Sequence, residues 1–276
     1  MLNSVVLLSP NRKSQVVINN GELVSYQKFD IEFIHPKEDL GWDHSDTEMF
    51  PIVGSTQANN FKVSTPKGEC IQDQHGLLRN LDYTLLKNDR INATFKKHYL
   101  KNTKINNPKY PSKSTKKEVF WSYDFNFTKK FTLSNDSLKI QFKIESEKGM
   151  PFMFGYHPAF NIKGKNIAYC SVNNQKITIA DILKAGSNAF PILHQNKLSL
   201  FNGNYGLELT TEGFNNFMLW TEVENMICIE PITQYTIKTQ DYSEKNMRIS
   251  NGKEKFTVLL KPEFGLSFDL QTVKKR

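Results

Sequence analysis

Regular alternation of apolar and polar residues constrains the fold of this chain more than any other feature. It is clearest over residues 138–145, where leucine, isoleucine and phenylalanine alternate with lysine, glutamine and glutamate. A period of two residues is typical of a strand with one face in the core and the other in solvent. The Ser-Asn-Asp-Ser sequence at 134–137 predicts a turn, which pairs this strand with residues 125–133 in an antiparallel hairpin.

Similar short segments recur along the chain, and no internal repeat divides it. Further strands are expected at 22–26, 30–35, 168–172, 206–210, 217–220, 256–260 and 265–270. One short helix is expected near 180–184, because Gly186 follows it as a stop signal. Many short strands separated by turns predict an all-β fold, a large antiparallel β-sandwich, built as a single domain over residues 1–276.

Composition narrows the class of protein. Of the 276 residues, 38% are hydrophobic, which is compatible with a sizeable core. The three cysteines, Cys70, Cys170 and Cys228, are too few and too scattered for a disulfide framework or a zinc site, so a reducing cytoplasm is the simplest setting. The apolar run at 5–8 is too short for a secretory signal, and no stretch is long enough to span a membrane. We therefore expect a cytoplasmic protein with no metal and no membrane partner.

Lysines are concentrated in one segment. Eight of them lie between residues 96 and 117, with no acidic residue among them, and they match the formal net charge of +8. They are Lys96, Lys97, Lys101, Lys104, Lys109, Lys113, Lys116 and Lys117. The segment is too polar for a core and predicts a long solvated loop at one edge of the fold. Attraction of an anionic substrate is the alternative. No nucleic-acid-binding motif accompanies the lysines, so we expect no nucleic-acid partner.

Two apolar segments each place an ionisable residue directly before a proline. One contains Gly-Tyr-His157-Pro, and the other contains Cys-Ile-Glu230-Pro. Because proline cannot donate to a ladder, each strand is expected to end there, with the imidazole beside the open space over Gly155. A buried carboxylate is costly unless it is paired or used. A histidine and a glutamate in equivalent settings therefore predict a proton-transfer pair.

A third polar stretch, at residues 73–79, has Gly76 at a turn with His75 and Arg79 on either side of it. Taken alone, this stretch has the character of a surface loop. Each ionisable residue also has an ordinary structural explanation, as a hydrogen-bonded histidine or a salt-bridged glutamate. The chemical interpretation therefore depends on the motifs together.

Together the motifs resemble the aldose 1-epimerase (galactose mutarotase-like) family, and within it the bacterial LacX-type branch. The chain has Gln-His-Gly-x-x-Arg at 74–79, His-Pro-Ala-Phe-Asn at 157–161 and Cys-Ile-Glu-Pro at 228–231. Phe-Pro-Ile-Val-Gly at 50–54 also matches the branch. The motifs follow the family's order, and the resemblance runs from about residue 21 to about residue 270.

The resemblance implies a β-sandwich with a sugar cleft on one sheet, and an isomerase that interconverts the α and β anomers of an aldohexose without a cofactor. By position, Glu230 falls where the family has its general base, and it would take the proton of the anomeric hydroxyl. His157 falls where the family has its general acid, which protonates the ring oxygen. His75 would hold ring-side hydroxyls, and Arg79 would contact the sugar or support the histidine. Trp220 is a candidate for stacking on the sugar, although core packing is commoner for an isolated tryptophan.

Departures from the family pattern leave the substrate open. Ser55 stands where many relatives have an arginine, so galactose is not assumed. Tyr156 precedes the histidine where other branches have glycine or asparagine, and we expect it to narrow the pocket. Two alternatives remain, a hexose-6-phosphate 1-epimerase and a carbohydrate-binding protein without turnover. In either case we expect a small sugar as partner, and a monomer or weak homodimer.

Overall fold

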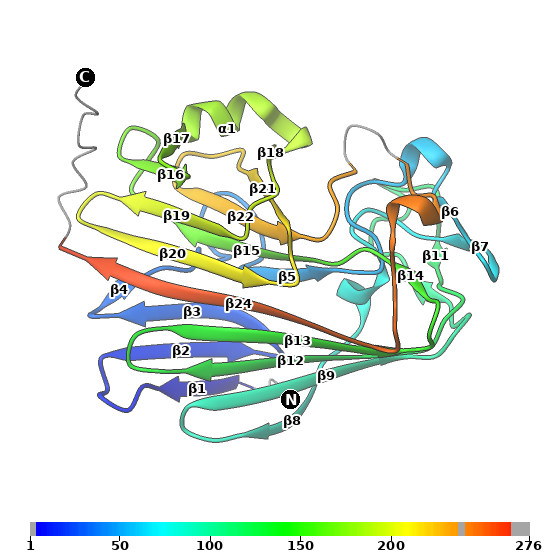
Figure 1. Ribbon diagram of the computed structural model, residues 1–276, viewed down its shortest axis with the longest axis horizontal. Coiled ribbons are helices and arrows are strands. Elements are labelled where there is room, and N and C mark those ends of the chain that lie inside the picture. Colours follow the sequence, from blue (N-terminus) through cyan, green and yellow to red (C-terminus); the bar gives the residue numbers. More distant parts are fainter. Residues whose placement is uncertain (1–3, 237–240, 266–276) are drawn as a thin grey trace.

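The computed structural model describes residues 4–236 and 241–265, and its strands form two large sheets (Figure 1). The larger, nine-stranded sheet consists in spatial order of β17 (Gln175–Thr178), β16 (Ala168–Val172), β19 (Lys197–Asn202), β20 (Tyr205–Glu212), β24 (Lys253–Phe264), β13 (Leu138–Ser146), β12 (Phe125–Leu133), β9 (Asn92–Tyr99) and β8 (Thr84–Asn88). The five-stranded sheet consists of β18 (Phe190–Leu193), β21 (Asn216–Trp220), β22 (Met226–Ile232), β15 (Gly155–Asn161) and β5 (Asp46–Met49).

Smaller elements complete the fold. The N-terminal sheet contains β1 (Ser4–Leu8), β2 (Ser14–Asn19), β3 (Glu22–Lys28) and β4 (Ile31–Glu32). Three strand pairs are β6 (Lys62–Thr65) with β7 (Gly68–Ile71), β10 (Ile105–Asn106) with β11 (Glu118–Val119), and β14 (Pro151–Phe152) with β23 (Arg248–Ile249). The helices are α1 (Ile179–Ala185) and the 3₁₀ turns η1 (Gln57–Asn59), η2 (Leu77–Asn80), η3 (Gly186–Asn188) and η4 (Glu244–Asn246). No helix of the described residues has the length and apolarity needed to cross a bilayer.

The main core lies between the two large sheets and is rich in aromatic rings. Phe142 on β13 packs against Phe154, with ring centroids 5.2 Å apart, and against Tyr156 at 5.1 Å. Phe127 on β12 contacts the same Phe154 at 5.6 Å. Phe127 and Phe142 occupy the apolar positions of alternating strands, whereas Phe154 lies in the short connection between β14 and β15. Burial of the facing sides of the two sheets holds the sandwich together.

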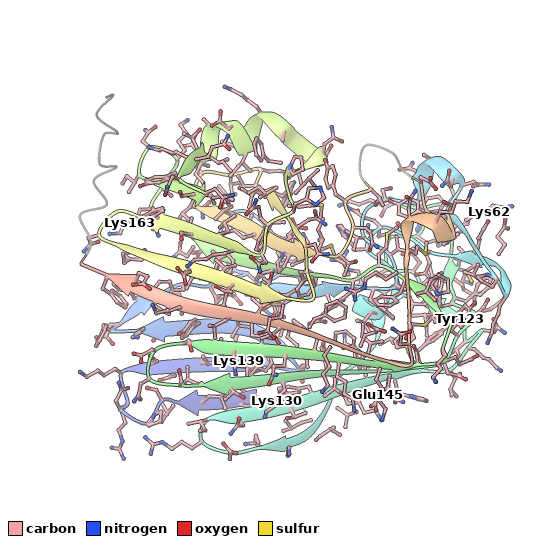
Figure 2. All side chains as sticks on the ribbon, viewed as in Figure 1. Lys62, Tyr123, Lys130, Lys139, Glu145 and Lys163 are labelled. Carbon is pink, nitrogen blue, oxygen red and sulfur yellow. The ribbon has the colours of Figure 1, made fainter. Side chains whose placement is uncertain are left out.

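The hairpin expected from the alternating pattern is confirmed. β12 and β13 pair from Leu133 opposite Leu138 to Phe125 opposite Ser146, and the polar positions, such as Lys139, point away from the core (Figure 2). The expected helix is confirmed as α1. Thr178 caps it and forms a capping box with Asp181, which satisfies two backbone donors at its start.

Several expected strands have different bounds. The strand expected at 30–35 is reduced to the two residues of β4. The apolar run at 150–154 does not extend β15, because Pro151 and Phe152 form the separate strand β14, which pairs with β23. The expected strand at 256–260 is the centre of the longer β24. Of the strand expected at 265–270, Gly265 lies in a bend, and the remainder falls outside the described residues.

The expectation that both site strands end at their prolines was wrong. β15 continues past Pro158 to Asn161, and β22 continues past Pro231 to Ile232. Residue-by-residue pairing between the two strands instead stops after Gly155 and resumes at Ala159. Proline lacks the N–H that a ladder needs, so it opens the ladder locally while the outer pairs keep the strands together.

The lysine-rich segment is not a single solvated loop. Lys96 and Lys97 belong to β9, and Lys97 is buried, with 5% of its surface exposed. Its Nζ donates to the Leu78 carbonyl at 2.9 Å and lies over the Tyr83 ring, 4.2 Å from the centroid. The sequence did not reveal that Lys97 is buried, because residue type alone does not distinguish a lysine with buried polar partners from a solvated one. Residues 101, 104, 113 and 117 are exposed as expected.

We expect Phe142→Ala to lower the free energy of unfolding by about 3–5 kcal/mol, because it removes a ring that packs against both sheets. Lys139→Ala, on the exposed face of the same strand, is the control and should change it by less than about 0.5 kcal/mol. Urea denaturation measures both. Equal effects would contradict the assignment of Phe142 to the core.

Candidate functional site

The structure brings His157 and Glu230 together across the open part of the ladder. Gly155 pairs with Ile232 and Ala159 with Cys228, so the same register sets His157 opposite Glu230. His157 Nε2 lies 3.4 Å from Glu230 Oε1. Both side chains are buried, with 7% and 2% of their side-chain surface exposed. Two strand neighbours with one proton-binding group each thus form a buried contact pair.

Burial acts in opposite directions on the two groups. It lowers the pKa of His157 to about 3, with a further contribution from the positive charge of Arg79. It raises the pKa of Glu230 to about 8, against the lowering effect of Arg79. Removal from water disfavours a charged imidazolium and a charged carboxylate alike. Both shifts favour the uncharged forms, so before substrate binds the shared proton is favoured on Glu230 rather than on His157.

His75 lies beside this pair, with its ring centroid 5.7 Å from that of His157. Its backbone has a φ of 68°, and the following Gly76 has a φ of 74°. A Cβ on Gly76 would lie 2.3 Å from the Phe50 carbonyl oxygen, so this close turn requires glycine. The Gly54 N–H donates to His75 Nδ1 at 3.2 Å, which leaves the proton of the neutral ring on Nε2.

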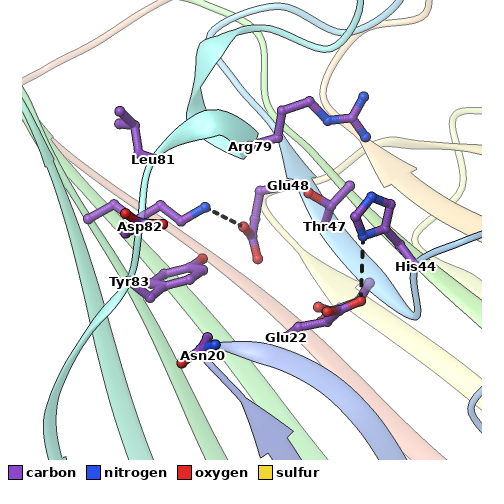
Figure 3. Close-up of a pocket in the computed structure, with 12 residues that line it drawn as sticks. Asn20, Glu22, His44, Thr47, Glu48, Arg79, Leu81, Asp82 and Tyr83 are labelled. Carbon is purple, nitrogen blue, oxygen red and sulfur yellow. Dashed lines mark ion pairs between the residues drawn. The ribbon is translucent and has the colours of Figure 1, made fainter. Parts of the chain in front are cut away.

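Arg79, on η2, extends from the same turn toward the pair. Its charge lowers the pKa of His157, Glu230 and His75, so it acts on all three. Arg79 also lines a cavity of about 440 Å³ at the outer side of β5 (Figure 3). The charged residues of that cavity are Glu22, Asp46, Glu48, Asp82, Arg79 and Lys97.

The cavity lies next to His157 and Glu230 and does not enclose them. Neither His157 nor Glu230 lines it, but Arg79 and Thr47 do. Thr47 pairs with His157 across β5 and β15, which puts their side chains on one face of the sheet. Arg79 and Thr47 thus link the cavity to the catalytic candidates.

Two tryptophans flank the His157 ring. Trp220, at the end of β21, has its ring centroid 6.2 Å from that of His157. Trp42 is closer, with centroids 4.2 Å apart. Both pack on a small buried cluster of Ala159, Met226 and Cys228 beside the pair.

The sequence did not point to Trp42. The only available signal was a single large aromatic residue, after Gly41, in a segment that is otherwise mostly polar. Such a residue is ambiguous until the fold puts it over another part of the chain.

Tyr156 does not narrow the pocket as expected. Successive side chains of a strand point to opposite faces, so Tyr156 faces away from His157 and into the core. Its hydroxyl donates to Asp46 Oδ2 at 2.7 Å. The other candidates, His157, Glu230, His75, Arg79 and Trp220, lie around one site.

Metal-binding groups do not gather here. Among residues 4–236 and 241–265, no group of three or more histidine, cysteine, aspartate or glutamate side chains is arranged to hold a metal ion. The three cysteines are free and buried.

Comparison with known structures supports the fold. A galactose mutarotase related enzyme from Lactobacillus acidophilus superposes with a TM-score of 0.72 at 18% identity, over 96% of this chain and 98% of the other. A galactose mutarotase-like protein from Lactobacillus casei gives a TM-score of 0.74 at 16% identity, over 95% and 99%. At these identities the likeness shows the fold alone.

Sequence comparison adds the family. The chromosomal LacX protein of Lactococcus lactis subsp. lactis is 26% identical over 151 residues, which cover 51% of this chain and 45% of LacX, so the match spans less than half of that relative. The model of the family described as aldose 1-epimerase matches residues 49–256, well over half of the chain. The chain therefore belongs to the aldose 1-epimerase family, as a relative of the LacX proteins.

Proposed function

We propose that the protein is an aldose 1-epimerase that interconverts the α and β anomers of a free aldohexose. One observation carries the proposal, the contact of 3.4 Å between His157 Nε2 and Glu230 Oε1 in a buried site. Ring opening needs one proton acceptor and one donor, and this pair holds one proton between two groups. Membership of the family supports the same reaction.

In the proposed reaction the sugar loses one proton and gains another. Glu230 takes the proton of the anomeric hydroxyl while His157 gives a proton to the ring oxygen, and the bond between the anomeric carbon and the ring oxygen breaks. The aldehyde carbon rotates, and the reverse transfers close the ring on its other face. Each positioned group contributes a factor of about 10²–10⁴ to the rate.

The proton must be on His157 for this direction, although burial puts it on Glu230 before substrate binds. A sugar hydroxyl that donates to the carboxylate stabilises its charged form, and the positive charge of Arg79 acts in the same sense. Substrate binding therefore shifts the shared proton to the imidazole. His75 and Arg79 are proposed to hold the ring hydroxyls, and Trp220 and Trp42 to contact the sugar face.

We also propose the remaining features of the protein from its sequence. It is a single unit over residues 1–276, cytoplasmic, and a monomer or weak homodimer. It works without a cofactor, because proton transfer needs no electron carrier. A protein that only binds carbohydrate does not require an acid–base pair, and for this reason we prefer an enzyme.

We expect His157→Ala and Glu230→Gln each to lower the rate of anomer exchange by about 10²–10⁴, because each removes one proton-transfer group. Exchange spectroscopy by NMR on glucose and galactose measures the rate, and a thermal melt shows that each variant is folded. His98→Ala and Glu212→Gln, which change exposed residues, are matched controls and should retain exchange. Near-normal exchange in either site variant would remove that residue from the mechanism.

The proton of the pair also sets the pH dependence. We expect kcat/KM to be level at neutral pH and to fall above about pH 8, where Glu230 would lose the proton that the pair holds. Arg79→Met removes a charge that lowers the pKa of Glu230, so this fall should move to higher pH. Arg90→Met is the control. An unchanged profile in Arg79→Met would contradict the electrostatic role of Arg79.

A hexose-6-phosphate 1-epimerase is the second candidate, because Arg79 and Lys97 both line the cavity next to the pair. Four carboxylates line the same cavity, and a phosphate would lie close to them. Phosphate selection usually relies on an arginine fork or a group of backbone N–H donors. We therefore favour a neutral sugar.

We expect kcat/KM for glucose to exceed that for glucose 6-phosphate at high salt. Exposed lysines increase the encounter rate of an anion, but salt screens them beyond a Debye length of about 8 Å. Any advantage of the phosphate at low salt should therefore disappear as salt is added. A preference for the phosphate that persists at high salt would replace the first candidate with the second.

A further inference from the structure

A buried ion cluster lies on the far face of the strand that carries His157. It consists of two lysines and two carboxylates, Lys97, Lys129, Asp46 and Glu48. Lys129 Nζ lies 2.6 Å from Asp46 Oδ2 and 2.7 Å from Glu48 Oε1, and its side chain is fully buried. Lys97 Nζ lies 3.9 Å from the other oxygen of Glu48. None of these groups takes part in the proposed proton transfer.

At one end, the cluster contacts β15, the strand that carries His157. Asp46 accepts a hydrogen bond from the Tyr156 hydroxyl at 2.7 Å, and Tyr156 is the chain neighbour of His157. Asp46 and Glu48 also flank Thr47, which is paired with His157. The orientation of His157 therefore depends on side chains anchored to the cluster from the opposite face.

At its other end, the cluster contacts η2, the turn that carries Arg79. The Lys97 ammonium donates to the Leu78 carbonyl at 2.9 Å, and Leu78 is the chain neighbour of Arg79 on η2. Figure 3 shows Arg79 on this turn, with Glu48 below it and the dashed contact between Glu48 and the lysine. The cluster thus connects β9, β5 and η2 within one network.

Stability alone does not account for such a cluster. The desolvation of four charged groups is costly, and apolar residues of similar volume are often equal or better in stability. Apolar packing does not supply directional hydrogen bonds to a chosen hydroxyl and a chosen carbonyl. The charged groups of the cluster supply such hydrogen bonds, and these fix the positions of the two segments that carry His157 and Arg79.

We propose that the buried ion cluster positions the site, with Lys97 as the positioning residue for Arg79. The proposal rests on the function proposed above. Without the ammonium, the Leu78 carbonyl keeps only the Leu81 N–H of its own turn, at 3.1 Å, and η2 loses the hydrogen bond that ties it to β9. Arg79 then moves away from the pair, and its effects on the sugar and on the shared proton are lost together.

A double-mutant cycle tests this proposal. Lys97→Met should lower kcat/KM by about ten- to a hundredfold, since misplacement by about 1 Å has effects of that order. It should also move the alkaline fall of kcat/KM to higher pH, as is expected of Arg79→Met. In the double variant Lys97→Met should add little, because both changes remove the same interaction. Lys97→Arg, which keeps a donor, should restore part of the activity.

Lys28→Met is the matched control. Lys28 is also buried, with 7% of its surface exposed, and lies 3.7 Å from Asp136. Its loss should change stability without moving the pH profile. Additive effects of Lys97→Met and Arg79→Met, or a Lys97→Met variant that is destabilised but kinetically normal, would overturn the proposal.

A second measurement separates this inference from the proposed function. The Nε–H signal of Arg79 in a ¹H–¹⁵N spectrum reports the surroundings of the guanidinium without any turnover. It should shift in Lys97→Met and stay in place in Lys28→Met. If the wild-type protein exchanges no sugar anomers, the proposed function fails, and this signal still decides the positioning role. An unmoved Arg79 signal in Lys97→Met would refute it.

Discussion

The ladder between β15 and β22 opens where each strand contains a proline, and the candidate site depends on that opening. Pairs on either side of the gap keep the strands in register, so His157 and Glu230 stay opposite each other. Both side chains are nevertheless buried, and Trp42 packs against the imidazole with ring centroids 4.2 Å apart. A fixed register around a local opening gives two titratable groups a defined separation inside a buried sheet.

Much of this arrangement was predictable from the sequence. Alternation predicted the hairpin of β12 and β13 because each of its strands has one face in the core and one in solvent. The equivalent placement of His157 and Glu230 before prolines suggested a pair, and the register of β15 and β22 brings the two side chains within 3.4 Å. Local patterns of this kind are informative because strand geometry has a period of two and proline lacks a donor.

Other features could not be predicted, because they depend on contacts between distant segments. Trp42 meets the His157 ring only after a loop folds over the sheet. Tyr156 was expected in the pocket, but the period of the strand turns it toward Asp46 in the core. Lys97 belonged to a run of lysines and gave no sign of burial. In each case the sequence gives the type of the residue, but the residue that it contacts is distant in the chain and is known only from the folded structure.

Lys129 has a consequence for how the molecule opens. It extends from β12 of the larger sheet to Asp46 on β5 of the smaller one, and Asp46 also accepts the Leu23 N–H of the N-terminal sheet. Separation of any of these sheets would break an ion pair or a hydrogen bond of Asp46 together with the surrounding apolar core. Partial opening is therefore suppressed, and the amides of β12, β5 and β3 should exchange hydrogen with similar free energies, as one cooperative unit.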